Sequence, residues 1–99
     1  MDVKLVNRGT DGELLLSGDL DTRTARDADQ LFLQMAERFT TLTLNMADLN
    51  YISSAGLRTI RNLYIKLNQK GGKLLITNVN GNVMEVFEMT GLAGLLNIR

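Results

Sequence analysis

The chain lacks cysteine, histidine, proline and tryptophan. Without cysteine it can form neither a disulfide framework nor a thiolate metal site. Without histidine it can have no Ser-His-Asp triad, no imidazole general base and no histidine-ligated zinc, which removes a large share of enzyme chemistry. The sequence therefore indicates a protein without catalytic turnover of its own.

An excess of one charge and long apolar runs are missing as well. The 11 basic residues balance the 11 acidic ones, which argues against electrostatic binding to nucleic acid or to an anionic membrane. No apolar run approaches the roughly 20 residues that a membrane-spanning helix needs, and residues 1–13 contain no signal-peptide core. We therefore expect a cytoplasmic protein with no nucleic-acid and no membrane partner.

What is present is the composition of an ordinary globular domain. The chain has 99 residues, of which 44% are hydrophobic and 22% are charged. This length suits one domain, and no proline, low-complexity stretch or repeat marks a linker. We expect residues 1–99 to form a single domain.

The apolar pattern predicts an N-terminal hairpin followed by three further strands. Residues 1–8 read as an edge strand, residues 9–12 as a turn, and residues 13–18 as the second strand of the hairpin. The run Leu14-Leu15-Leu16 is too continuous for a strand with one wet face, so we expect that strand to be covered on both faces. The further strands are predicted in residues 40–46, 73–77 and 95–98.

Three amphipathic helices are predicted between these strands. Their candidate N-caps are Asp21 or Thr22, Ser53 or Ser54, and Asn80 or Asn82. The expected inner faces, in the same order, are Ala25, Ala28, Phe32, Met35 and Phe39; Leu57, Ile60, Leu63, Tyr64 and Leu67; and Val83, Val86, Phe87 and Thr90. Gly71-Gly72 ends the second helix and Gly91 the third.

The order β-β-α-β-α-β-α-(β) sets the fold class. Strands that alternate with helices indicate a parallel sheet, and a leading hairpin adds an antiparallel edge. We therefore expect a mixed α/β fold with a four- to five-stranded, mostly parallel sheet and about three helices.

Residues 45–57 (NMADLNYISSAGL) join a predicted buried strand to the second helix. Open α/β sheets place their sites at such strand ends. A serine here can cap the helix, which stabilises a fold by roughly 1 kcal/mol. A phosphoserine is also tolerated at a helix N-terminus, where it adds about −1.5 to −2 charges. The residues alone leave a structural cap and a regulatory site both open.

Four segments resemble bacterial anti-sigma factor antagonists, the founding members of the STAS family. The signature segment is residues 51–58 (YISSAGLR). Residues 16–21 (LSGDLD), 71–74 (GGKL) and 86–92 (VFEMTGL) resemble three other motifs of the family, in the same order and spacing. The likeness spans nearly the whole chain, and it implies a STAS fold that agrees with the order of elements read from the residues.

The resemblance also implies a function. In this family the unphosphorylated protein binds a cognate anti-sigma factor, itself a serine kinase, and so frees a sigma factor. Phosphorylation ends this binding, and a phosphoserine phosphatase restores it. The family's acceptor serine stands two residues before the Gly-Leu pair, which is Ser54 here. Ser53 occupies the place where relatives often carry aspartate, so it is the alternative and less favoured acceptor.

The same resemblance implies a partner-binding surface around the acceptor. Asp21 matches an aspartate that shapes the kinase-facing surface in the family, and the residue also suits a helix cap. No cofactor and no metal is implied. The expected partner contacts are Asp21, Asp48, Asn50, Ser53, Ser54, Ala55, Gly56 and Arg58.

Other functions fit less well. A phosphate-accepting receiver could gather Asp19, Asp21 and Asp48 around magnesium, but it would need five βα units. A serine hydrolase lacks G-x-S-x-G and a histidine, and Gly71-Gly72 is no nucleotide-binding Walker loop. The alternative that stays open is a non-switching STAS interaction subunit of a stress-signalling or lipid-transport complex.

Overall fold

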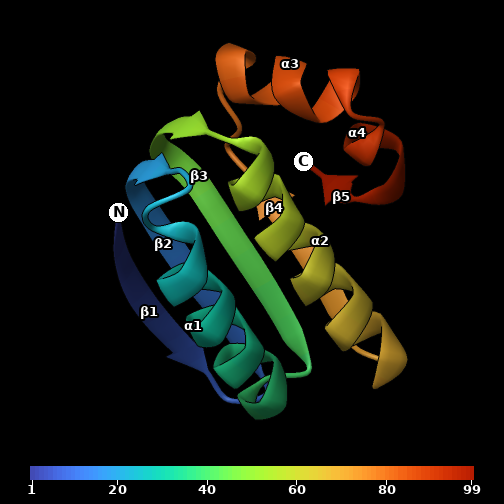
Figure 1. Ribbon diagram of the computed structural model, residues 1–99. Coiled ribbons are helices and arrows are strands. Elements are labelled where there is room, and N and C mark those ends of the chain that lie inside the picture. Colours follow the sequence, from blue (N-terminus) through green and yellow to red (C-terminus); the bar gives the residue numbers. More distant parts are fainter.

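The computed structural model describes residues 1–99 as one five-stranded sheet with four helices (Figure 1). The sheet order is β1-β2-β3-β4-β5, with β1 antiparallel to β2 and all other neighbours parallel. The strands are β1 (Asp2–Arg8), β2 (Asp11–Leu20), β3 (Thr41–Ile52), β4 (Lys73–Thr77) and β5 (Asn97–Ile98). The helices are α1 (Ala25–Arg38), α2 (Ser54–Gln69), α3 (Gly81–Met89) and α4 (Leu92–Leu95).

This arrangement confirms the predicted mixed α/β class with its antiparallel N-terminal edge. The short α4 is an additional turn of helix that the apolar pattern does not indicate, because it carries no stripe and its residues are not buried. None of the four helices combines the length and the apolar character that crossing a membrane requires.

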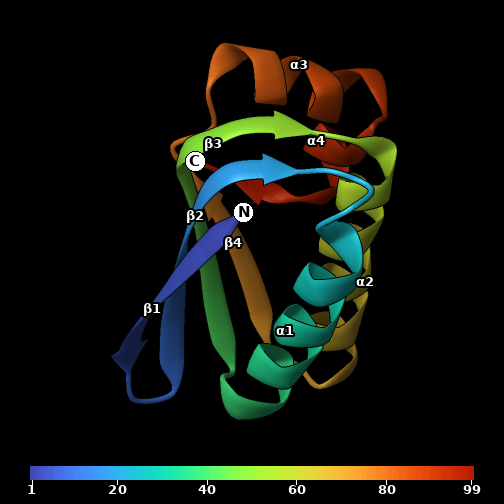
Figure 2. The ribbon, with the colours of Figure 1, turned by 60° about the vertical axis from the view of Figure 1, so that its left-hand side comes forward.

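The long helices α1 and α2 lie side by side on one face of the sheet, and α3 lies beyond the upper end of β3 (Figure 2). Leu14 and Leu16 face the helices and are buried, whereas Leu15 is only half-buried on the opposite face. Leu15 is paired there with Asn45, which is also partly exposed. The expectation that this strand is covered on both faces is therefore wrong. Its outer face is open to solvent and carries a single partly exposed leucine, Leu15.

Strands β2 and β3 extend past their predicted ends at Gly18 and Met46. Their pairing shifts register twice, between Leu15 and Ser17 and between Gly18 and Asp19. Such bulges break the alternation of buried and exposed residues and bend the strands, as Figure 2 shows. The stretch from Asp48 to Ile52 is consequently strand rather than the predicted loop, and only Ser53 separates β3 from α2.

The core lies between the sheet and α1 and α2. Most predicted inner positions are buried, including Leu57 and Ile60 of α2. The prediction was less accurate at four positions, because Met35, Tyr64 and Val86 are only half-buried and Thr90 is exposed. The Thr90 hydroxyl instead donates to carbonyl oxygens at the end of α3. The fully buried side chains with the largest volumes are Phe32, Phe39, Phe87, Leu14, Leu16, Leu20, Leu42, Leu44, Met46, Leu49, Ile60 and Leu63.

The first turn of α2 lies against the end of β2. A Cβ on Gly56 would stand 2.6 Å from the carbonyl oxygen of Leu20, which is closer than real Cβ atoms approach. The same oxygen accepts a hydrogen bond from the backbone N–H of Ser53 at 2.9 Å. Residue 56 must therefore be glycine for α2 to begin where it does.

We expect Gly56→Ala to lower the free energy of unfolding by about 1–3 kcal/mol, because the methyl group must displace backbone rather than a flexible side chain. Gly81→Ala is the matched control. Gly81 also lies near the start of a helix, but nothing stands within 4 Å of its Cβ position, so its stability should stay equal or rise by up to about 1 kcal/mol. Urea unfolding of both variants measures the difference, and equal effects would contradict the close contact.

Candidate functional site

The two adjacent serines at the start of α2 have different surroundings. Ser53 is the N-cap, and its Oγ accepts the backbone N–H of Gly56 at 3.2 Å. Ser54 is the first helical residue; it is exposed and its hydroxyl has no hydrogen-bond partner within the chain. The Ser53 hydroxyl is thus engaged in holding the helix, whereas the Ser54 hydroxyl is available to a reagent from outside.

Asp21 lies next to this point, because Leu20 pairs with Ile52 and the Leu20 carbonyl binds Ser53. Its Oδ1 accepts the backbone N–H groups of Arg23 and Thr24 at 2.9 and 3.1 Å. In return, the Thr24 hydroxyl oxygen accepts the backbone N–H of Asp21 at 2.9 Å. Asp21 therefore caps the turn that leads into α1, whereas the N-cap of the helix is Thr24 rather than the predicted Asp21 or Thr22.

These contacts favour the ionised form of the Asp21 carboxyl. The backbone N–H of Thr24 is the main cause that holds the pKa of this carboxyl below its usual value of 3.8, and the N–H and guanidinium of Arg23 act in the same direction. The Arg23 guanidinium lies 3.5 Å from Oδ2. The site therefore carries a fixed anion whose oxygens are already occupied by its own turn.

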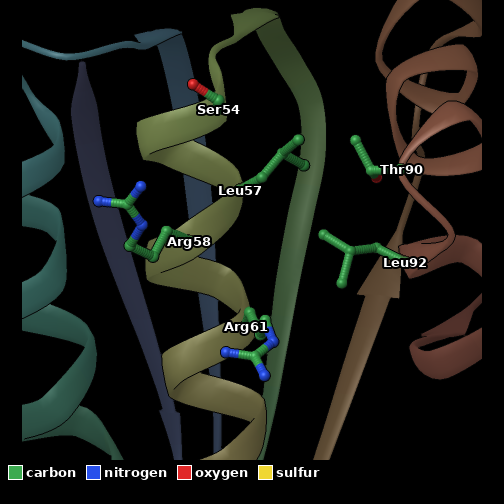
Figure 3. A pocket seen from close by; sticks show the side chains of 6 residues that line it. All are labelled: Ser54, Leu57, Arg58, Arg61, Thr90 and Leu92. Carbon is green, nitrogen blue, oxygen red and sulfur yellow. The ribbon is translucent and has the colours of Figure 1, made fainter.

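A hollow of about 340 Å³ opens beside Ser54. Figure 3 shows Leu57 pointing toward α3 and α4, with Ser54, Arg58 and Arg61 following one another down α2. The lining residues are Ser54, Leu57, Arg58, Arg61, Thr90 and Leu92. Sequence reasoning missed Arg61, although its position seven residues after Ser54 places it on the same helix face.

The structure brings some of the predicted contact residues together and separates others. Ser53, Ser54 and Arg58 share the start of α2, with Asp21 alongside. Ala55 is half-buried there, and Gly56 is fully covered by the end of β2. These residues form one site at the junction of β2, β3 and α2.

Asp48 and Asn50 lie elsewhere on β3. Both side chains are exposed. Asp48 lines a hollow with Asp2 and Ser17 next to β1, and Asn50 lines another with Val83 of α3. No three potential ligands among the acidic residues gather closely enough to hold a metal ion, so Asp19, Asp21 and Asp48 do not form a magnesium site.

Comparison with known proteins identifies relatives of the whole chain. The family model that matches is that of the STAS domain, over residues 3–99. The anti-sigma F factor antagonist of Paenibacillus polymyxa is 33% identical over 88 residues, which cover 84% of this chain and 73% of that protein.

Solved structures agree on the fold. An anti-sigma factor antagonist from Mycobacterium paratuberculosis has a TM-score of 0.86 at 18% identity, covering 98% of this chain and 83% of that one. The Bacillus protein SpoIIAA in its phosphorylated form has a TM-score of 0.77 at 18% identity, covering 99% of this chain and 91% of that one. At such low identities, these likenesses show a common architecture.

We expect Ser53→Ala to lower the free energy of unfolding by about 1 kcal/mol, because the N–H of Gly56 loses its cap. Ser54→Ala is the adjacent control, and it should change stability by less than about 0.5 kcal/mol, since that hydroxyl is exposed and forms no hydrogen bond within the chain. Chemical denaturation measures both. A larger loss for Ser54→Ala would show that the two roles are reversed.

The Asp21 carboxyl predicts a pH dependence of stability. Because its pKa is lower in the native state than the usual 3.8, the unfolded chain binds more protons in acid, and stability rises with pH. The contribution is complete above 3.8 and is lost as the pH falls through the lowered native pKa. Asp21→Asn should remove this component from unfolding curves measured between neutral and acidic pH.

Asp19→Asn provides the comparison for that experiment. Its carboxylate is exposed and accepts no hydrogen bond, so the variant should keep the acid-sensitive component of the parent chain. If Asp19→Asn and Asp21→Asn flattened the pH profile equally, the acid sensitivity would not arise from the turn before α1.

Proposed function

We propose that this chain, which belongs to the STAS domain family, is an anti-sigma factor antagonist controlled by phosphorylation of Ser54. Unphosphorylated, it binds an anti-sigma factor that is also a serine kinase and so frees a sigma factor, acting in the cytoplasm. Phosphorylation by that kinase ends the binding, and a phosphoserine phosphatase restores it. The observation that carries this proposal is the exposed, unpartnered hydroxyl of Ser54 in the first turn of α2.

The geometry favours Ser54 over Ser53 as the acceptor. A phosphate on Ser53 would have to replace an oxygen that already accepts the N–H of Gly56, at the point where α2 lies against β2. A phosphate on Ser54 leaves this cap intact and projects from an exposed position. Modification at Ser54 therefore changes the surface without loosening the fold.

In the transfer itself, the chain supplies only the acceptor oxygen. The Ser54 Oγ forms a bond to the terminal phosphorus of a nucleoside triphosphate held by the kinase, and the bond from that phosphorus to the nucleoside diphosphate breaks. The hydroxyl proton passes to a base of the kinase, because the chain has no histidine and Asp21 is hydrogen-bonded to its own turn. In this transfer the protein itself contributes no catalytic group, metal or cofactor.

The proposed partner surface is centred on the start of α2. Its contact residues there are Asp21, Ser53, Ser54, Ala55 and Arg58, while the buried Gly56 acts by positioning the helix. Asp48 and Asn50, which lie apart on β3, would be reached only by a partner that extends beyond this point. A phosphate of about −1.5 to −2 charges placed in this interface must lose water or meet acidic groups of the partner. Unfavourable charge contacts of this kind cost several kcal/mol, and each 1.4 kcal/mol weakens binding about tenfold.

In the test, the purified protein is incubated with ATP and an anti-sigma factor kinase from the same organism, and the phosphate is mapped by mass spectrometry. We expect label on Ser54, retained in Ser53→Ala and absent in Ser54→Ala. In a binding assay without ATP, Ser54→Ala should bind the kinase like the parent protein. Ser54→Asp should bind at least about tenfold more weakly while staying folded.

Two other outcomes have defined meanings. If the label disappears in Ser53→Ala and persists in Ser54→Ala, the acceptor is Ser53. If neither serine is labelled and Ser54→Asp binds normally, the chain is a non-switching interaction subunit of a stress-signalling or lipid-transport complex.

A further inference from the structure

We propose that Arg58 and Arg61 form a phosphate clamp, which binds the phosphate of phosphorylated Ser54 within the same chain. This inference rests on the proposed function and specifies how the same site is regulated. It is carried by the hollow of about 340 Å³ beside Ser54, whose only charged lining residues are these two arginines.

The three residues follow one face of α2. Arg58 and Arg61 stand four and seven residues after Ser54, which places them one and two turns further along the same side of the helix. Side chains four residues apart on a helix are close enough to interact. Figure 3 shows both arginine side chains below Ser54, with the guanidinium of Arg58 directed toward α1 and that of Arg61 in front of α2. Both side chains are exposed and can rotate toward Ser54. A phosphate on Ser54 therefore lies within reach of the Arg58 side chain, and Arg61 is the next cationic residue along the same face.

Neither arginine is neutralised in the unphosphorylated chain. The ion pairs of the structure join Arg8 to Glu13 and Arg23 to Asp21, and no carboxylate lines the hollow. The protein has no net charge, so two unpaired guanidinium groups in one hollow are a local concentration of positive charge. Guanidinium groups bind phosphate through paired, charge-assisted hydrogen bonds.

The other walls of the hollow suit this role. Leu57 is almost fully buried and, with the half-buried Leu92, forms an apolar floor that supplies no competing charge. The phosphate would fold back along α2 rather than extend into solvent. Phosphorylation then neutralises Arg58 of the proposed partner surface and the neighbouring Arg61, in addition to placing an anion there.

The test is a ³¹P NMR titration of the intact chain with phosphoserine placed at position 54 during translation by an expanded genetic code. The second pKa of a free phosphoserine is about 6. Nearby guanidinium groups favour the dianion, so we expect the pKa in the folded protein to lie about half a unit or more below its value in the same protein unfolded in urea. Arg58→Gln should reverse most of this shift, Arg61→Gln part of it, and the double variant nearly all of it.

Lys66→Gln is the matched control. Lys66 is an exposed cation on the same helix, in its last turn, so the variant loses the same charge at a distance from Ser54. The pKa of the phosphate should stay at its parent value. An Asp21→Asn variant, titrated alongside, measures the opposing effect of the carboxylate on the neighbouring turn, which Arg23 already pairs.

A phosphate that titrates alike in the folded and unfolded protein would overturn the clamp, as would an unchanged pKa in Arg58→Gln. If Lys66→Gln reduced the pKa shift of the phosphate as much as Arg58→Gln did, the shift would arise from the overall positive charge of the helix and not from a clamp. Both arginines are exposed, so the variants should fold, and circular dichroism checks this. Since no kinase is used, failure of the clamp and failure of kinase labelling at Ser54 are separate results.

Discussion

Where β2 meets α2, the carbonyl oxygen of Leu20 accepts the N–H of Ser53 and occupies the space that a Cβ on residue 56 would need. This close approach joins the ends of β2 and β3 to the first turn of the helix at one point. Asp21 follows Leu20 directly, and Ser54 follows Ser53, so the anion and the exposed hydroxyl are placed by the same backbone contact. A larger residue at position 56 would separate them by moving α2 away from the sheet.

The sequence predicted where the site lies, but it did not predict the hydrogen bonding and exposure of each residue in it. The serine pair, Gly56 and Asp21 were all identified from motifs, and the caps at Ser53 and Asn80 have the chemistry expected of helix starts. The pattern could not say which serine was free, because both suit a cap and only the backbone angles of Ser53 decide. Arg61 was overlooked because an exposed arginine on a helix resembles any solvated residue until α3 and α4 enclose the space beside it.

The errors in the fold have a common origin in the irregular part of the sheet. Alternation of buried and exposed residues indicates a strand only while pairing is regular, and the bulges between β2 and β3 interrupt it near Ser17 and Gly18. The end of β3 therefore resembled a loop. Leu15 caused a different error. Because it is apolar, it suggested that a second layer covers the outer face of the sheet, but it is only half-buried on that face.

The different surroundings of the two serines would allow the proposed phosphorylation to change the surface while the fold remains constant. The groups that stabilise the junction, namely the Ser53 cap, the Leu20 carbonyl and the Asp21 turn, have their hydrogen bonds satisfied within the chain. Ser54 takes part in none of them, so a charge added to its oxygen changes the free energy of unfolding little. The same charge would stand beside Arg58 of the proposed interface and the neighbouring Arg61, neither of which is paired, and there we propose that it acts on binding. A residue that is exposed, unpartnered and rigidly placed has the properties a regulatory acceptor needs.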